Sequence, residues 1–192
     1  MEKETKIPEI PYLDPSHKFE GPPKEGGKSF YEFAKHRIKY LTKEEFIKFD
    51  RDTGGFPDEE HISPAFHIID PESLQEGDNL EKWVDRLEIA VNIDTFKIKG
   101  KDYSDLMPFV AEHEIYEAWL RAKKGTASTF DREKQHILAQ RRAFLLAEQQ
   151  GLGDRLLEWS KLILPDNTKH IEQCEYALRA AKRQLGRLKI KK

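Results

Sequence analysis

The sequence predicts an α+β fold that is predominantly helical, with a small strand or hairpin followed by an antiparallel pair of helices. Apolar and polar residues alternate along residues 87–93, which is the period of a strand. Further along the chain, apolar residues recur every three or four positions in four stretches, which is the period of amphipathic helices. Hydrophobic residues make up 38% and aromatic residues 10% of the 192 positions, enough to build the core of a globular domain.

Composition and charge exclude several classes of protein. The 33 Lys and Arg residues nearly balance the 35 Asp and Glu residues, so net charge alone gives no argument for nucleic-acid binding. No run approaches the roughly 18 apolar residues of a membrane helix, and the first residues lead into no apolar signal region. The single cysteine, Cys174, excludes an internal disulfide framework and a cysteine-based zinc cluster. We therefore expect a cytoplasmic protein with no membrane partner.

The first 79 residues divide into three segments. Residues 1–28 are rich in Pro and Gly and offer too few apolar groups to offset the entropy of ordering, which predicts a flexible N-terminal arm. Residues 29–50 suggest two short helices, the second of which begins at the capping-box pattern Thr42-x-x-Glu45. Gly and Pro interrupt residues 51–79 repeatedly, so we expect an irregular segment there.

The sequence pattern of the rest of the chain predicts one strand followed by helices. Residues 87–93 predict a half-buried strand, which Phe96 and Ile98 extend after a shift in phase and which a turn at 99–101 ends. Helices are predicted over 104–124, 131–150, 154–164 and 167–188, with Gly125, Gly151 and Pro165 at their boundaries. We assign residues 29–165 to a globular domain and residues 166–192 to a C-terminal amphipathic helix with a basic tail.

A histidine and a carboxylate occupy the most apolar face of the predicted helix over 104–124. His113 and Glu117 are four residues apart, so they point the same way from a helix. At about 100° per residue, several apolar side chains lie within about 60° of His113, namely Leu106, Phe109, Val110 and Leu120. A polar side chain that faces inward must be hydrogen-bonded, paired or bound to a metal.

The next predicted helix offers a third ligand. His136 shares a face with small residues, Ala139, Ala143 and Ala147, which allow two helices to approach closely. The short connection between the helices favours antiparallel packing, in which His136 faces His113 and Glu117. Two imidazoles and one carboxylate bind catalytic zinc with an open fourth position. Glu114 lies next to a ligand, where it would act as the general base.

This arrangement resembles that of the zincin metallopeptidases. Their signature is His-Glu-x-x-His on a helix, with a third ligand downstream and a preceding edge strand that binds an extended substrate. Residues 113–117 read His-Glu-Ile-Tyr-Glu, so Glu117 stands where the signature has its second histidine. The pattern is more similar to a compact variant in small uncharacterised bacterial and phage-encoded proteins, in which a lone His follows on the next helix. The resemblance covers residues 87–151 and implies a zinc-dependent hydrolase, a peptidase above all, with 87–93 as the edge strand and a peptide or protein as substrate.

Two other interpretations stay open. His113 and Glu117 could form a buried hydrogen-bonded pair without a metal, or the metal could be purely structural. The alternative function is that of a non-enzymatic interaction protein, related to phage or mobile elements. Its partner would contact residues 179–192, which contain seven Lys or Arg and no acid and could attract an acidic surface or nucleic acid.

The remaining polar candidates receive lesser roles. Asp94 and Glu112 are the candidates for orienting a ligand histidine from behind. His67 lies in the segment predicted to be irregular, where we expect it to be solvated. His170 and Cys174 are four residues apart on the last helix and are interpreted as ordinary helix residues.

Overall fold

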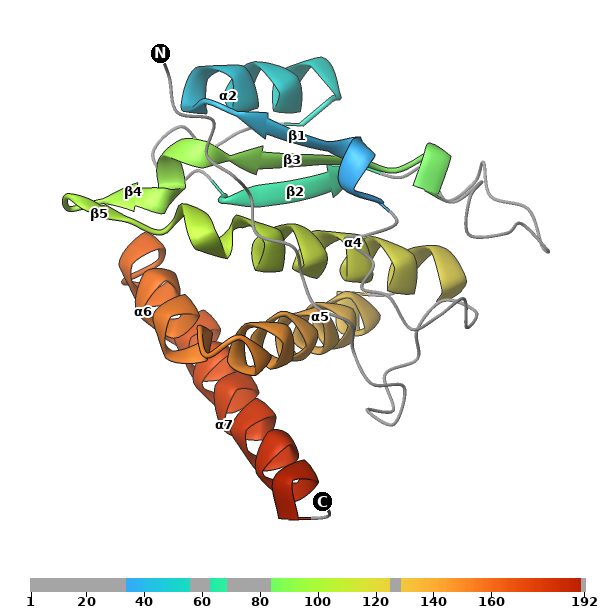
Figure 1. Ribbon diagram of the computed structural model, residues 1–192. Helices are drawn as coiled ribbons and strands as arrows, with labels where there is room; N and C mark the ends of the chain where they lie inside the picture. The colour runs from blue at the N-terminus through green and yellow to red at the C-terminus, as the bar shows by residue number, and fades with distance from the viewer. Residues whose placement is uncertain (1–33, 56–62, 69–83, 125–128, 191–192) are drawn as a thin grey trace.

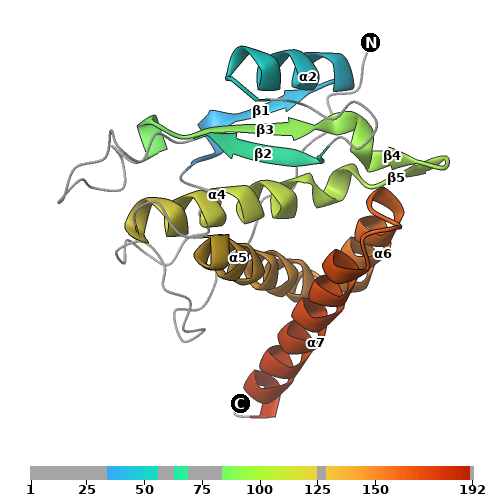
Figure 2. The same cartoon turned by 180° about the vertical axis from the view of Figure 1, so that it is seen from behind.

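A small sheet lies between two helices, and three more helices pack beyond one of them (Figures 1 and 2). The computed structural model describes residues 34–55, 63–68, 84–124 and 129–190, so the predicted N-terminal arm lies outside the described residues. Helix α2 (Lys43–Asp52) covers one face of the sheet and α4 (Met107–Lys124) covers the other. Helices α5 (Thr129–Gln149), α6 (Gly153–Ile163) and α7 (Thr168–Ile190) complete the fold. The predicted class, predominantly helical α+β, is confirmed.

The sheet contains two strands that the sequence analysis did not predict. Its order is β1-β3-β2, where β1 (Ile38–Leu41) is parallel to β3 (Glu88–Asn92) and β2 (Ala65–Ile68) is antiparallel to it. The prediction of a short helix before Thr42 was therefore wrong over β1, and the segment predicted to be irregular contains β2. Both strands are only four residues long. Their hydrogen-bond partners lie far away in the chain, so local patterns give little signal for them.

The predicted edge strand is in fact the central strand. β3 is hydrogen-bonded on both sides, and β1 and β2 are the outer strands. The prediction that β3 is half-buried was also wrong, because Ala90 is fully buried and Asn92 is 2% exposed. The reason is that α2 and α4 cover opposite faces of the sheet, so both alternating sets of β3 side chains face a helix.

Helix α2 is capped at its start from two directions. Thr42 Oγ1 accepts a hydrogen bond from the Glu45 amide, and a Glu45 carboxylate oxygen accepts one from the Thr42 amide, which confirms the predicted capping box. The Asp94 carboxylate accepts a further hydrogen bond from the Lys43 amide at 2.8 Å. Asp94 therefore caps α2. The sequence had suggested that it orients a ligand histidine, and this suggestion was wrong.

A tight hairpin connects the sheet to α4. Residues Ile93–Phe96 form a 3-10 helix where the strand was expected to continue, and β4 (Lys97–Ile98) then pairs with β5 (Lys101–Asp102). The predicted turn is confirmed, with positive φ angles at Lys99 (51°) and Gly100 (73°), as a two-residue type I′ turn requires. On the far side of the hairpin, Lys101 and the Tyr103 hydroxyl contact Glu158 of α6, which ties the hairpin to the helical layer.

Helices α4 and α5 form the antiparallel pair that the sequence predicted. Residues early in α4 contact residues late in α5, as in the buried ion pair between Glu112 and Arg142 at 2.6 Å. Residues late in α4 contact residues early in α5, as Glu117 contacts His136. Ala139 and Ala147 are fully buried on this face, so the small side chains permit the close packing that was expected.

Helices α5, α6 and α7 meet at two glycines. Gly151 ends α5 with φ 74°, and the amides of Gly151 and Leu152 bond back to Glu148 and Ala147, the pattern of a Schellman cap. A Cβ atom added to Gly153 would lie 2.3 Å from Glu148 Oε2 and 2.7 Å from a Leu178 methyl carbon, so a larger residue would require the ends of these side chains to move. Helix α7 contributes to the same core as the preceding helices through four buried residues, Cys174, Ala177, Leu178 and Ala181.

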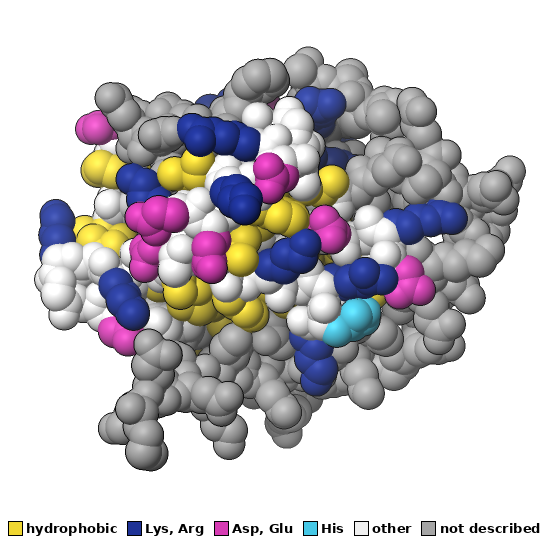
Figure 3. Space-filling view, turned by 90° about the horizontal axis from the view of Figure 1, so that it is seen from above, with side chains coloured by type: hydrophobic (Ala, Val, Ile, Leu, Met, Phe, Trp, Pro, Cys, Tyr) yellow, Lys and Arg dark blue, Asp and Glu magenta, His cyan; other side chains and the backbone are white. Residues whose placement is uncertain are grey.

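Charges of both signs are mixed on one face of the molecule. On the face viewed from above in Figure 3, Lys and Arg side chains are interspersed with Asp and Glu side chains. Two cations of the predicted basic tail are paired, Lys182 with Asp154 at 2.7 Å and Arg179 with Glu175 at 3.7 Å. Among the described helices, none combines the length and the hydropathy needed to cross a membrane.

Candidate metal centre

Helix α4 directs two of the three candidate ligands into the protein. His113 and Glu117 are buried, with 8% and 5% of their surface exposed, and they face α5 from successive turns. His136 approaches from α5 and is only partly buried, since 36% of its side chain is exposed. The site therefore lies at the boundary between the core and solvent, as a centre open to a small molecule requires.

Three potential ligand atoms form a nearly equilateral triangle. His113 Nε2 lies 3.1 Å from His136 Nδ1 and 3.2 Å from Glu117 Oε2, and His136 Nδ1 lies 3.0 Å from the same oxygen. Within the described ranges, these three residues are the group of His, Cys, Asp or Glu side chains that comes together in a way that could hold a metal. Donor atoms bound to tetrahedral zinc at 2.0–2.1 Å are about 3.3 Å apart, which is close to the observed spacing.

With Glu117 ionised and no metal bound, the hydrogen-bonded triangle keeps one close contact between like groups. With Glu117 ionised, two ring N–H groups can both donate to its carboxylate, but the two nitrogens then face each other as donors at 3.1 Å. If one ring nitrogen is deprotonated, its lone pair faces the carboxylate oxygen, and two acceptors are in contact. One unfavourable contact remains in either case. A cation that accepts a lone pair from all three atoms removes it.

The surrounding charges keep Glu117 ionised. Burial alone would raise its pKa, but hydrogen bonds from His113 and His136 and the charge of Arg121 outweigh burial, so the pKa is held well below its ordinary value. Arg121 donates to the second carboxylate oxygen of Glu117 and thereby orients it. Burial would lower the pKa of His136, but the contact with the Glu117 carboxylate raises it above its ordinary value.

Glu114 lies beside the triangle and is paired with a histidine that the sequence analysis set aside. His67 Nδ1 lies 2.7 Å from Glu114 Oε2, and the His67 side chain is 5% exposed, so the expectation that His67 is solvated was wrong. Burial would raise the pKa of Glu114, but the hydrogen bond with His67 outweighs it and the pKa is lowered.

The placement of His67 follows from strand geometry. Phe66 packs against Phe46 and Phe49 of α2, with ring centroids 4.9 and 5.7 Å apart. Since successive side chains point to opposite faces of a strand, His67 must face α4. The signal available in the sequence was the four-residue run Ala-Phe-His-Ile after Pro64, which is too short to separate from the loop around it.

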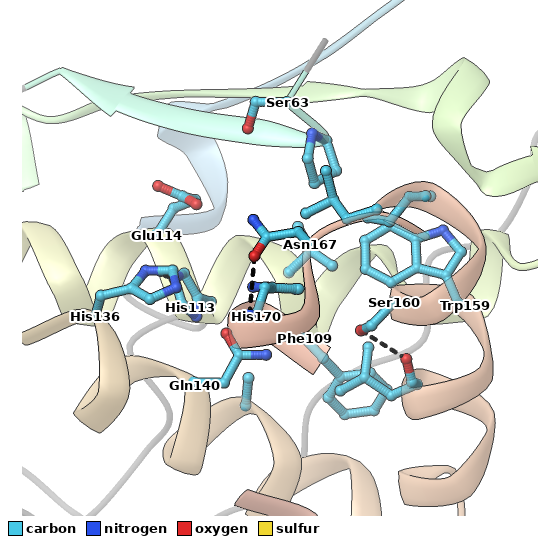
Figure 4. A pocket seen from close by; sticks show the side chains of 16 residues that line it. Ser63, Phe109, His113, Glu114, His136, Gln140, Trp159, Ser160, Asn167 and His170 are labelled. Atoms are coloured by element: carbon cyan, nitrogen blue, oxygen red, sulfur yellow. Dashed lines mark hydrogen bonds between the residues drawn. The ribbon is translucent and has the colours of Figure 1, made fainter. Parts of the chain in front are cut away.

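A cavity of about 290 Å³ opens beside the triangle (Figure 4). His113, Glu114 and His136 line one end of it, and Figure 4 shows Trp159 and Phe109 at the other. His170, interpreted as an ordinary helix residue, also lines it, with its ring centroid 6.3 Å from that of His136. Burial and the charges of His136 and His113 lower the pKa of His170 to about 4, so this ring is neutral at pH 7.

A second, more open cavity reaches the triangle from another side. It has a volume of about 380 Å³ and is lined by charged and polar side chains, Glu117, Arg121, Arg132, Glu133, His136, Asn167, Lys169, His170 and Gln173. His136 and His170 line both cavities. The centre is thus accessible from a polar side and from an apolar side.

Glu112, the other residue suggested to orient a ligand, lies elsewhere. Its carboxylate is fully buried and accepts a hydrogen bond from Arg142 Nε at 2.6 Å. The Arg142 guanidinium also lies 5.1 Å from the centroid of the Tyr116 ring. Glu112 therefore stabilises the packing of α4 on α5 through this ion pair.

Comparison with known proteins gave no relationship to guide the assignment. The chain matches no protein-family model, no curated protein and no solved structure. The resemblance to zincins therefore stays a prediction from the motif.

Proposed function

We propose that this protein is a zinc-dependent hydrolase, a peptidase of zincin-like design. His113, Glu117 and His136 would be the zinc ligands and Glu114 the general base. The observation that carries this proposal is the triangle of three potential ligand atoms 3.0–3.2 Å apart, a spacing close to that of the atoms bound to tetrahedral zinc. Bound zinc would supply Lewis acidity, activating water and polarising a carbonyl group.

The residues around the triangle fit the proton transfers that hydrolysis needs. Attack of water on a peptide carbonyl forms a C–O bond and releases a proton, and cleavage of the C–N bond requires a proton at the leaving nitrogen. Glu114 lines the same cavity as His113 and His136, so its carboxylate can accept the first proton and donate it to the amine. The hydrogen bond with His67 holds one oxygen of that carboxylate in place.

Strand β2 supports a peptide as the substrate. Among the described strands it pairs with β3 alone, so its other side can hydrogen-bond to an extended chain. Ser63 and Pro64, just before β2, line the cavity, and His67 within it contacts Glu114. A peptide added to this edge would pass alongside the metal ligands. This role was expected for residues 87–93, which the central position of β3 excludes.

The first test is the metal content of the protein. Untagged protein purified without added metal or chelator should contain about one zinc per chain by elemental mass spectrometry, and His113→Ala should lose it. His36→Ala is the matched control, because His36 is exposed and is remote in sequence from the candidate ligands. Absence of stoichiometric metal, even after zinc is added back, would overturn the proposal.

The second test separates catalysis from a structural metal. Glu114→Gln should keep the zinc and lower the rate of peptide hydrolysis by about 10²–10⁴-fold, the usual contribution of a general base. Cleavage of a mixed peptide library, followed by mass spectrometry, is the assay. A zinc-loaded protein that cleaves no peptide would identify the ion as structural and leave the enzyme assignment without support.

A further inference from the structure

We propose that the cavity of about 290 Å³ beside the metal centre is a specificity pocket for one large apolar side chain, aromatic or long aliphatic, next to the scissile bond. The inference rests on the proposed function for the statement that the ligand is a peptide. The chemical character of the pocket depends only on its walls and can be tested without metal or activity.

The deep end of the cavity is apolar. Helix α4 contributes Phe109 and Val110, and α6 contributes Leu156, Trp159 and Ile163. Each of these side chains belongs to the hydrophobic core or packs against it, so the wall is held in place by the rest of the fold. Burial of an apolar side chain against such a wall is favourable because it removes apolar surface from water.

Three polar groups in the wall are already engaged within the protein. The Ser160 hydroxyl donates to the Leu156 carbonyl at 2.9 Å, and the Trp159 indole N–H donates to the Thr95 carbonyl at 3.0 Å. The Gln140 amide donates to Cys174 Sγ at 3.0 Å. A charged or amide side chain entering this end would lose its hydration and meet groups already committed to other partners, which is costly.

The volume selects a large side chain. A cavity of about 150 Å³ lined by aliphatic and aromatic residues accepts a benzene ring. The present cavity, at about 290 Å³, is roughly twice that size, which leaves room for a phenyl, isobutyl or indole group together with part of its own backbone. The space exists because α5 presents a small residue there, Ala143, where a larger side chain would project into the cavity.

The position of the pocket determines which side chain of the substrate binds in it. His113, Glu114 and His136 form one end of the same cavity, so a group that fills it is attached within about one residue of the carbonyl at the metal centre. The pocket therefore discriminates between the side chains that flank the cleaved bond.

Binding of blocked single amino acids tests the pocket directly. Protein stripped of metal by a chelator is titrated with N-acetyl-L-phenylalaninamide, N-acetyl-L-leucinamide, N-acetylglycinamide and N-acetyl-L-lysinamide, and the NMR resonance of the Trp159 indole N–H is followed. We expect the phenylalanine and leucine compounds to shift this resonance and to bind about 10–100-fold more tightly than the glycine compound. The lysine compound should bind no better than glycine.

Variants of the wall identify the binding site. Ala143→Leu fills the cavity and should reduce the preference for phenylalanine over glycine to less than about twofold. Ile163→Trp offers a second way to fill it should Ala143→Leu fail to fold. Leu162→Trp is the matched control, since Leu162 precedes Ile163 on α6 and is also partly buried but does not line the cavity. It should keep the preference.

The outcomes separate this proposal from the proposed function. Equal binding of all four compounds, or tighter binding of the lysine compound, would overturn the pocket even in a protein that binds zinc and cleaves peptides. Selective binding of the apolar compounds, lost in Ala143→Leu, would support the pocket even in a protein whose triangle binds no metal. In zinc-loaded protein the hydrolysed library should show large apolar residues beside the cleaved bond, and an unselective library would contradict the inference.

Discussion

At the residue scale, the contact between His67 and Glu114 gives a candidate base a fixed orientation. The two side chains come from β2 and α4 and meet at 2.7 Å. Among the described residues His67 Nε2 has no hydrogen-bond partner. The hydrogen bond between Nδ1 and Glu114 is therefore the polar contact that orients the His67 ring within this part of the chain. The role we assign to His67 is therefore that of a positioning residue, which acts through Glu114.

Substitution of His67 should lower the rate of hydrolysis without releasing the metal. His67→Ala leaves Glu114 without its partner, and we expect the rate to fall by about 10–100-fold, as for other residues that orient a functional group from behind. In His67→Asn, the amide nitrogen takes roughly the place of Nδ1 and should restore most of the rate. Zinc content and peptide cleavage are measured on the same preparations. Loss of zinc in His67→Ala, or equal activity of the Ala and Asn variants, would contradict the positioning role.

At the element scale, the packing of α4 on α5 depends on a buried ion pair. Glu112 is fully buried, and the side chain of Arg142 is 5% exposed. Removal of one partner leaves a charge in the core, and we expect Glu112→Leu to lower the free energy of unfolding by about 3–5 kcal/mol. The double variant Glu112→Leu, Arg142→Leu removes both charges and should be less destabilised than the single variant. Urea denaturation measures the double variant and each single variant, and additive losses would show that the charges are not coupled.

The elements whose formation depends on residues close together in the chain could be predicted from the sequence. The elements that depend on hydrogen-bond partners far away in the chain could not. The α4–α5 pair and the facing of His113, Glu117 and His136 follow from helical spacing and a short connection, both of which are properties of neighbouring residues. Strands β1 and β2 are stabilised by hydrogen bonds to β3, which lies about 50 and 25 residues away along the chain. Each has only four residues, too few to reveal the alternation of apolar and polar side chains that marks a strand. The partner of Glu114 was missed for the same reason, because His67 belongs to β2.

At the scale of the whole molecule, the proposed metal would join two helices of the core. Its ligands come from α4 and α5, and the first of these also packs on the sheet while the second packs on α6 and α7. Zinc bound here would therefore stabilise the folded state as a unit, because an unfolded chain does not hold the three ligands together.

Thermal unfolding should consequently depend on zinc concentration. With free zinc at about 1,000 times its dissociation constant, linkage predicts a stabilisation of about 4 kcal/mol, equivalent to a rise in Tm of about 10 °C for a chain of this size. His136→Ala removes one ligand and should abolish most of the rise, whereas Glu114→Gln, which leaves the three ligands in place, should keep it. Calorimetry of the three proteins, each with chelator and with buffered zinc, makes the comparison. An identical rise in His136→Ala and the unaltered protein would mean that zinc binds elsewhere, and the triangle between α4 and α5 would then be a hydrogen-bonded part of the core.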